Sequence, residues 1–382
     1  MTDEHVQLAR EVAKRSIVLL KNTKKILPLD AEKKANVAVI GPLAKDKDTP
    51  LGNWRAAAIK NSAVSLYEGI ENAIGSNVNL TYAKGCELSV GENNFFNELT
   101  IEEGDRSMFR QAIRTARKAD VVIMALGEPA YMSGEARSRS EISMPGLQLE
   151  LLKEIRKVND NVVLVLMNGR PLTIQWEAEN IPAIVEAWHL GSEAGNAIAD
   201  VLFGKYNPSG KLPMSFPKSV GQIPVFYNHK ATGRPSTDPG MVFYTHYMDV
   251  DNSALFPFGY GLSYSQFDYS NLRTNNTEMK PDGTITVSVD VKNSSDVDGE
   301  EVVQLYLRDL VSSVTRPVKE LKKFEKVMIK GGETKTITFE LNNNDLSFYR
   351  KDLSFGSEAG KFKVFVGGNS ADLLESKFSL VE

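Results

Sequence analysis

Residues 121–127 read VVIMALG, and residues 162–169 read VVLVLMNG. Each stretch is a solid apolar run that ends in glycine and is followed by a polar segment, and residues 37–41 and 181–191 show the same pattern. Apolar runs without alternation are typical of strands that are buried on both faces of a parallel sheet. These four runs therefore decide the fold of the first half of the chain.

Helical patterns separate the four runs, at about residues 65–74, 107–118, 145–157 and 193–203. Alternation of buried strands with amphipathic helices predicts an α/β domain: an open, mostly parallel α/β sandwich with helices on both faces of the sheet. Another amphipathic helix is expected at the start of the chain, because apolar residues recur at three- and four-residue spacing from Val6 to Leu20. Its expected N-cap is Thr2 or Asp3, and its expected end is Lys21-Asn22.

The second half of the chain has a different composition and a different pattern of apolar residues. Residues 207–266 are rich in Gly, Pro and Tyr and are expected to form an extended connecting segment. From residue 267 to residue 382, apolar and polar residues alternate strictly in several short runs separated by turn signals. This pattern predicts an all-β domain, a fibronectin type III-like (immunoglobulin-like) β-sandwich. The expected division is therefore 1–206, 207–266 and 267–382.

Composition excludes several classes of function. The chain has 382 residues, a hydrophobic fraction of 42% and a net charge of -4, which is ordinary for a globular protein of two or three domains. This near-balanced charge argues against a nucleic-acid or membrane-surface role. The single cysteine, Cys86, and four scattered histidines favour neither a disulfide nor a metal site. No glycine-rich phosphate-binding motif or Gly-x-Ser-x-Gly motif is present.

The sequence shows neither a targeting signal nor a membrane-spanning signal. No apolar stretch approaches the length of a membrane span. The first residues are acidic, whereas a secretory signal begins with basic residues followed by an apolar run, so no signal peptide is expected in this chain.

Ligands of open α/β sheets bind beyond the carboxyl ends of the strands. This rule selects the loops that begin at Gly41, Gly127, Asn168 and His189. Among them, residues 127–141 are the most polar, with three carboxylates and two arginines. A carboxyl group there could be a general acid with a raised pKa, or the charges could pair with one another and tie the loop down.

Two further side chains at this edge allow alternative interpretations. Trp54 lies two residues after Gly52 on the first loop, where it could stack against a sugar or lie half-buried under its own loop. Arg170 could bind an anion or brace the edge of the sheet. His189 has no partner histidine nearby in the sequence, so a metal site there has little support.

A series of motifs spans nearly the whole chain. Residues 15–22, 39–42, 133–139, 168–171, 191–204, 208–213 and 257–264 read RSIVLLKN, VIGP, SGEARSR, NGRP, GSEAGNAIADVLFG, PSGKLP and PFGYGLSY. Their order resembles the C-terminal half of the glycoside hydrolase family 3 β-glucosidases, and the SGEARSR variant is similar to the bacterial periplasmic type.

The resemblance implies a third, N-terminal TIM-like barrel domain that carries the nucleophilic aspartate and that is absent from this chain. It further implies that Glu135 is the general acid/base, with Glu128 as the second choice, and that Trp54 flanks the leaving-group subsite. The implied substrate is a β-glucoside or oligosaccharide, with no cofactor and no metal. The implied location of the full-length protein is periplasmic or secreted, and a homodimer is left open.

Three interpretations compete on these grounds. The first is an enzyme part, inactive alone, that supplies the acid/base of a retaining β-glucosidase or, within the same family, of a β-xylosidase. The second is a non-catalytic carbohydrate-binding or scaffold module. The third is an independent α/β enzyme of another class, which the absence of a nucleophile motif disfavours.

Overall fold

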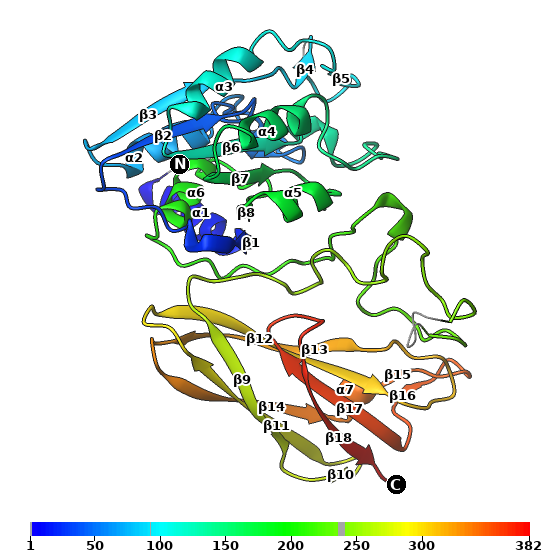
Figure 1. Cartoon of the computed structure of the whole chain (residues 1–382). Helices are drawn as coiled ribbons and strands as arrows, with labels where there is room; N and C mark the ends of the chain where they lie inside the picture. The colour runs from blue at the N-terminus through cyan, green and yellow to red at the C-terminus, as the bar shows by residue number, and fades with distance from the viewer. Residues whose placement is uncertain (1, 92, 236–240) are drawn as a thin grey trace. The chain divides into compact units, whose positions relative to one another are not determined.

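The computed structural model describes residues 2–91, 93–235 and 241–382 (Figure 1). The chain divides into two compact units, Met1–Gly210 and Lys211–Glu382. The first unit is an α/β domain and the second is built on two β-sheets, so the predicted fold class is confirmed.

The first unit contains a six-stranded sheet with the order β1-β8-β7-β6-β2-β3. Its strands are β1 (Val18–Asn22), β2 (Ala35–Ile40), β3 (Val78–Ala83), β6 (Val121–Gly127), β7 (Val162–Met167) and β8 (Ala183–Glu186). All pairings are parallel except that of the edge strand β1 with β8. The four apolar runs form β2, β6, β7 and β8, whereas β3 was not foreseen.

Helices cover both faces of this sheet (Figure 1). They are α1 (Asp3–Ser16), α2 (Leu66–Ala73), α3 (Phe109–Arg117), α4 (Gln148–Arg156), α5 (Gln175–Asn180) and α6 (Ala194–Leu202). Helix α6 packs against α2 and α1, and α3 packs against α4. The shorter elements are the strands β4 (Ser89–Val90) and β5 (Thr100–Ile101) and the 3-10 turns η1 (Thr23–Lys25), η2 (Thr49–Leu51) and η3 (Ala130–Met132).

The predicted end of the first helix is wrong. The Thr2 side chain caps α1 as expected, by accepting a hydrogen bond from the His5 backbone, but the helix ends at Ser16 rather than at Lys21-Asn22. The next residues, 17–20, are fully buried, and β1 begins at Val18 as the edge strand beside β8. Four consecutive apolar residues bury all their side chains better in a covered strand than on one face of a helix.

The strand order fixes where a site can form. Strand β2 lies between β3 and β6, so the chain leaves β2 in one direction and later returns on its other side. Loops at such a switch point diverge and leave a crevice at the carboxyl ends of the strands. The loops after β2 and β6 therefore flank the expected ligand position.

The second unit contains a five-stranded sheet, β10-β18-β17-β12-β13, and a three-stranded sheet, β14-β11-β9. The main strands are β9 (Phe267–Thr274), β11 (Thr284–Asn293), β12 (Gly299–Asp309), β13 (Glu320–Ile329), β14 (Thr334–Asn342), β17 (Gly360–Gly367) and β18 (Leu374–Leu380). The small elements are β10 (Glu278–Met279), α7 (Asn343–Leu346), β15 (Phe348–Tyr349), β16 (Phe355–Gly356) and the turn η4 (Val220–Gln222).

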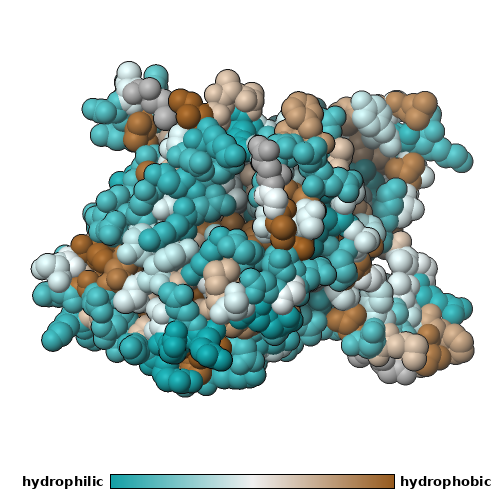
Figure 2. All heavy atoms as spheres, turned by 90° about the horizontal axis from the view of Figure 1, so that it is seen from above, coloured by the Kyte–Doolittle hydropathy of each residue, from teal (hydrophilic) through white to brown (hydrophobic). Residues whose placement is uncertain are grey.

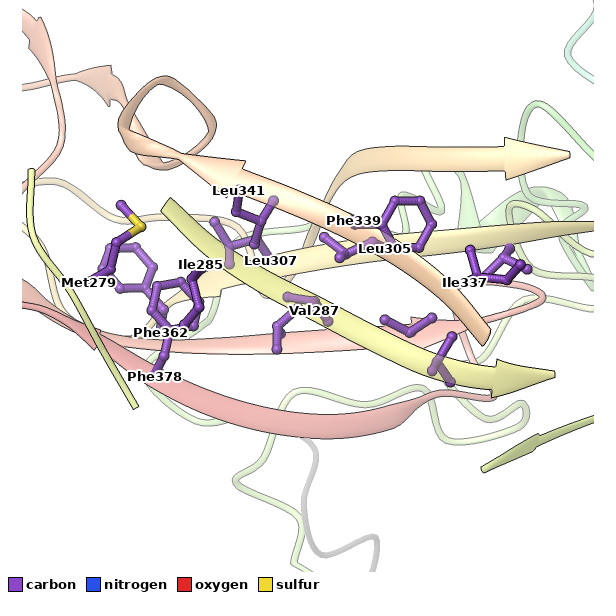
Figure 3. Close-up of a cluster of buried hydrophobic side chains, with 14 of the residues drawn as sticks. Met279, Ile285, Val287, Leu305, Leu307, Ile337, Phe339, Leu341, Phe362 and Phe378 are labelled. Carbon is purple, nitrogen blue, oxygen red and sulfur yellow. The ribbon is translucent and has the colours of Figure 1, made fainter. Parts of the chain in front are cut away.

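Alternating apolar residues of both sheets make one core (Figure 3). Along β11, Ile285, Val287, Val289 and Val291 are fully buried while their neighbours are more exposed. Burial of alternate residues is what a sandwich of two half-buried sheets requires.

The segment from residue 211 to residue 266 belongs to the second compact unit. Tyr227 stacks on Phe258, with ring centroids 4.3 Å apart, and lies edge-on to the fully buried Tyr306 of β12. The Gln304 side chain donates hydrogen bonds to the carbonyls of Gly259 and Gly368. These contacts attach the segment to the sandwich, while the finer division at residues 206 and 266 stays a prediction.

No helix in the described part of the chain is long and apolar enough to cross a membrane. The face seen in Figure 2 is mostly hydrophilic, and its hydrophobic residues occur in small separate groups. Among the exposed hydrophobic side chains, Phe95 and Phe96 lie next to each other on the loop between β4 and β5.

Candidate active site

The loop after β6 leaves the sheet in a tightly fixed conformation. Gly127 has a φ of 146°, and a Cβ added there would lie 2.0 Å from the carbonyl oxygen of Met167. The buried Gln148 side chain accepts a hydrogen bond from the Gly127 backbone N–H and donates to the Gly127 carbonyl. The start of the loop is therefore held against both β7 and the beginning of α4.

Glu128, the first residue after β6, is completely buried and paired with two arginines. Arg139 Nη1 lies 2.7 Å from Glu128 Oε1, and Arg170 Nε lies 3.1 Å from the same oxygen. A buried carboxylate is tolerated only when such partners satisfy it. Glu128 is thus engaged as the structural anchor of this loop.

Arg170 also holds the middle of the loop. Its Nη2 donates hydrogen bonds to the Met132 carbonyl and, at 2.9 Å, to the Arg137 carbonyl. These two carbonyls bracket the turn of residues 133–136. Of the two roles considered for Arg170, bracing is therefore the one that its contacts support, and the pairing of loop charges applies to Glu128 rather than to Glu135.

Glu135 lies on an exposed turn between these braced ends. Gly134 and Ala136, on either side, have φ values of 108° and 56°. Within the described ranges, the Glu135 carboxyl forms no ion pair. The turn thus presents a free carboxylate on an ordered support, which is what a general acid/base needs.

The loop after β2 is fastened to the same turn. Asn53 is buried and donates a hydrogen bond of 2.7 Å from Nδ2 to the Ser133 carbonyl. Arg55, paired with Asp48, packs over the ring of Tyr131. Trp54, between these two anchors, is 72% exposed, so it does not lie half-buried under its own loop.

Two titratable side chains lie at the end of β8 or just beyond it. Burial raises the pKa of Glu186 well above the usual carboxyl range, although its carboxylate accepts hydrogen bonds from Trp188 N–H and Asn168. Burial lowers the pKa of His189 to about 4, so the ring is neutral at neutral pH. His189 therefore contributes packing and polarity beneath the loops rather than charge.

The site therefore gathers residues from three loops. Glu128, Glu135 and Trp54 were predicted from the sequence, and the structure places the last two on exposed segments joined through Asn53 and Ser133. The connecting roles of Asn53, Arg139 and Gln148 were missed, because no local pattern marks a contact across 80, 11 or 21 residues.

A small cavity of about 290 Å³ adjoins these loops. Its lining residues are Asp46, Asp48, Thr49, Lys60, Gly91, Asn93, Pro129, Ala130 and Tyr131. In the described part of the chain, no group of three His, Cys, Asp or Glu side chains is arranged to hold a metal ion.

Comparison with known families covers both units. Residues 17–264 match the glycosyl hydrolase family 3 C-terminal domain, and residues 301–370 match a fibronectin type III-like domain. The chain belongs to glycosyl hydrolase family 3. The resemblance inferred from the sequence motifs is thereby confirmed.

Several members of family 3 are similar over the whole chain. The periplasmic β-glucosidase of Salmonella typhimurium is 44% identical over 99% of this chain, and a β-xylosidase of Formosa agariphila is 40% identical over 97% of it. The crystal structure of a β-glucosidase from Listeria innocua in complex with gluconolactone superposes with a TM-score of 0.90 at 39% identity, over 100% of this chain. This chain spans 50%, 49% and 50% of these three proteins, respectively.

Proposed function

We propose that this chain is the C-terminal part of a retaining β-glucosidase and that Glu135 is its general acid/base. The observation that carries the proposal is the contrast between the two carboxyls of one loop. Glu128 is buried and paired with two arginines, whereas Glu135 is exposed on a turn that Arg170 and Asn53 hold in place. Only the second carboxyl is free to reach a glycosidic oxygen.

The proposed mechanism divides the chemistry between two domains. A retaining glycosidase needs two carboxyl groups about 5–5.5 Å apart, one as nucleophile and one as acid/base. Glu135 would protonate the departing oxygen and then, as a carboxylate, remove a proton from the water that attacks the glycosyl-enzyme. The nucleophile belongs to the N-terminal half that the relatives contain and this chain does not cover. We therefore expect the chain alone to be inactive.

The sugar is proposed from the relatives. Solved structures of the Listeria β-glucosidase include complexes with glucose and with laminaribiose, and the Salmonella relative is a β-glucosidase. A terminal β-D-glucosyl residue is thus the favoured substrate. The Formosa relative makes β-xyloside the alternative. The name of the Salmonella enzyme also supports a periplasmic location.

The test is leaving-group dependence in an enzyme that joins the N-terminal half of the Salmonella relative to this chain. Glu135→Gln should slow hydrolysis of a phenyl or alkyl β-glucoside by about 10²–10⁴-fold, because a poor leaving group needs protonation. The first step on a dinitrophenyl β-glucoside should be slowed far less. Azide, which needs no general base, should attack the glycosyl-enzyme, restore turnover of that substrate and yield glucosyl azide.

Glu128→Gln is the matched control in the same loop. It should lower activity toward both leaving groups alike and show no rescue by azide. Rescue of Glu128→Gln but not of Glu135→Gln would assign the acid to the other glutamate. If neither variant is rescued, neither of these two glutamates is the acid, and a non-catalytic sugar-binding module becomes the better interpretation.

A further inference from the structure

The hairpin between β4 and β5 carries two adjacent exposed aromatic residues. Phe95 is 44% exposed and Phe96 is 91% exposed, and their rings meet edge to face with centroids 5.6 Å apart. Aromatic pairs of this geometry usually contribute to a core or an interface. Here the pair faces solvent at the tip of a loop.

The tip of this hairpin is held in a defined shape. Asn94 Oδ1 accepts hydrogen bonds of 2.9 Å from the backbone N–H groups of both Phe96 and Asn97. The side chains of Ser89 and Asn93 bond to each other at the base. The aromatic pair is therefore presented by a turn with its own internal hydrogen bonds.

The hairpin is attached directly to the turn that carries Glu135. Arg137 Nη2 donates a hydrogen bond of 2.5 Å to the carbonyl oxygen of Phe95, and Arg137 follows Glu135 by two residues. Gly91 and Asn93 also line the cavity that Tyr131 and Asp48 line. The aromatic pair and the proposed acid are thus parts of one connected surface.

We propose that Phe95 and Phe96 form a wall of the leaving-group site and select glycosides whose leaving group is an aromatic or alicyclic alcohol. This inference rests on the proposed function of Glu135. The Ser133 end of the turn is bonded to Asn53, next to Trp54, and the Arg137 end is bonded to the Phe95 carbonyl, so two loops that carry exposed aromatic residues are attached to the turn.

The chemistry of phenylalanine favours an apolar leaving group over a second sugar. Tyr and Trp rings offer a hydroxyl or an N–H that can satisfy a sugar hydroxyl, but the phenylalanine ring has no polar atom. A flat hydrocarbon ring placed on Phe96 would remove apolar surface from water on both partners and leave no hydroxyl group without a hydrogen-bond partner.

The test uses the chain as it is, with 2-naphthyl β-glucoside as the probe. In a saturation-transfer NMR experiment, we expect transfer from the protein to the naphthyl protons to exceed transfer to the glucose protons. The double variant Phe95→Ala/Phe96→Ala should lose this transfer. Phe324→Ala, which removes a phenylalanine that is 67% exposed in the second unit, should retain it.

Absence of naphthyl transfer to the unmodified chain, or equal transfer to the double variant, would overturn the inference. In the active hybrid enzyme, the double variant should lower kcat/KM for the naphthyl glucoside by about 2- to 10-fold more than it lowers kcat/KM for cellobiose. Equal losses on both substrates would also overturn it. The azide test of Glu135→Gln judges the acid separately, so the two proposals can fail independently.

Discussion

Replacing Glu128 by glutamine should destabilise the first unit strongly, whereas the same change at Glu135 should not. The Glu128 side chain is 0% exposed, and its partners Arg139 and Arg170 are only 17% and 19% exposed. Removing the charge leaves two arginines facing a neutral amide in a poorly hydrated site. Breaking a buried ion pair typically costs about 3–5 kcal/mol, and we expect the lower end because both arginines keep some contact with water.

The assay exploits the distribution of tryptophan. All three tryptophans, Trp54, Trp176 and Trp188, belong to the first unit, so their fluorescence reports its unfolding alone. With a urea dependence of roughly 2 kcal/mol per molar, a loss of about 3 kcal/mol shifts the midpoint down by about 1.5 M.

Glu135→Gln, seven residues further along the same loop, should leave the midpoint unchanged because that side chain is exposed. Adding Arg170→Gln to Glu128→Gln should cost less than the sum of the two single changes, since they share one interaction. A midpoint shift below about 0.5 M for Glu128→Gln, or an equal shift for Glu135→Gln, would refute the anchoring role of Glu128.

Three other predictions concern features outside the site. Burial raises the pKa of Glu177 to about 7, so its ionisation opposes folding: the contribution of this side chain to stability should be greatest below pH 4.5, fall as the pH rises through about 7 and then level off. Glu177→Gln should therefore raise the free energy of unfolding, measured by urea denaturation, by up to about 3 kcal/mol at pH 8 but not at pH 4.5. Burial raises the pKa of the Cys86 thiol to about 12, so the folded chain should not react with a thiol reagent at pH 8 until urea unfolds it. A fragment of residues 267–382 should unfold at lower urea than one of residues 211–382 by tyrosine fluorescence, because it lacks the groups that contact Tyr306 and Gln304; equal midpoints would contradict this.

The parts of the fold that could be predicted are those in which the local pattern of apolar residues determines how a segment is buried. The apolar run of residues 162–167 indicates a doubly covered strand, and the alternation from Ile285 to Val291 indicates a half-covered one. Strand β3, with the sequence VNLTYA at the edge of the sheet, is too polar to show either pattern clearly. The helical spacing at the start of the chain extended into β1, because a solid apolar run satisfies helical and strand periodicity alike.

For the site, too, only the features that follow from local sequence could be predicted. Loop positions could be derived from the strand ends, and the motif resemblance pointed to Glu135. What the sequence could not show is how the loop is held, because Arg170 reaches Met132 and Arg137 across 38 and 33 residues. Nor does composition distinguish Glu128 from Glu135, since burial of one carboxyl and exposure of the other depend on tertiary structure.

The bracing of the Glu135 turn has a consequence for how such enzymes can diversify. Because the anchors Met132, Ser133 and Arg137 are held through their backbone carbonyls, their side chains can change without loss of those hydrogen bonds. The tip of the β4–β5 hairpin can lengthen or shorten while the sheet and the Glu135 turn stay intact. Substrate preference can therefore change through this loop. Loss of either Glu128 or Arg170, by contrast, would leave the other without this ion-pair partner.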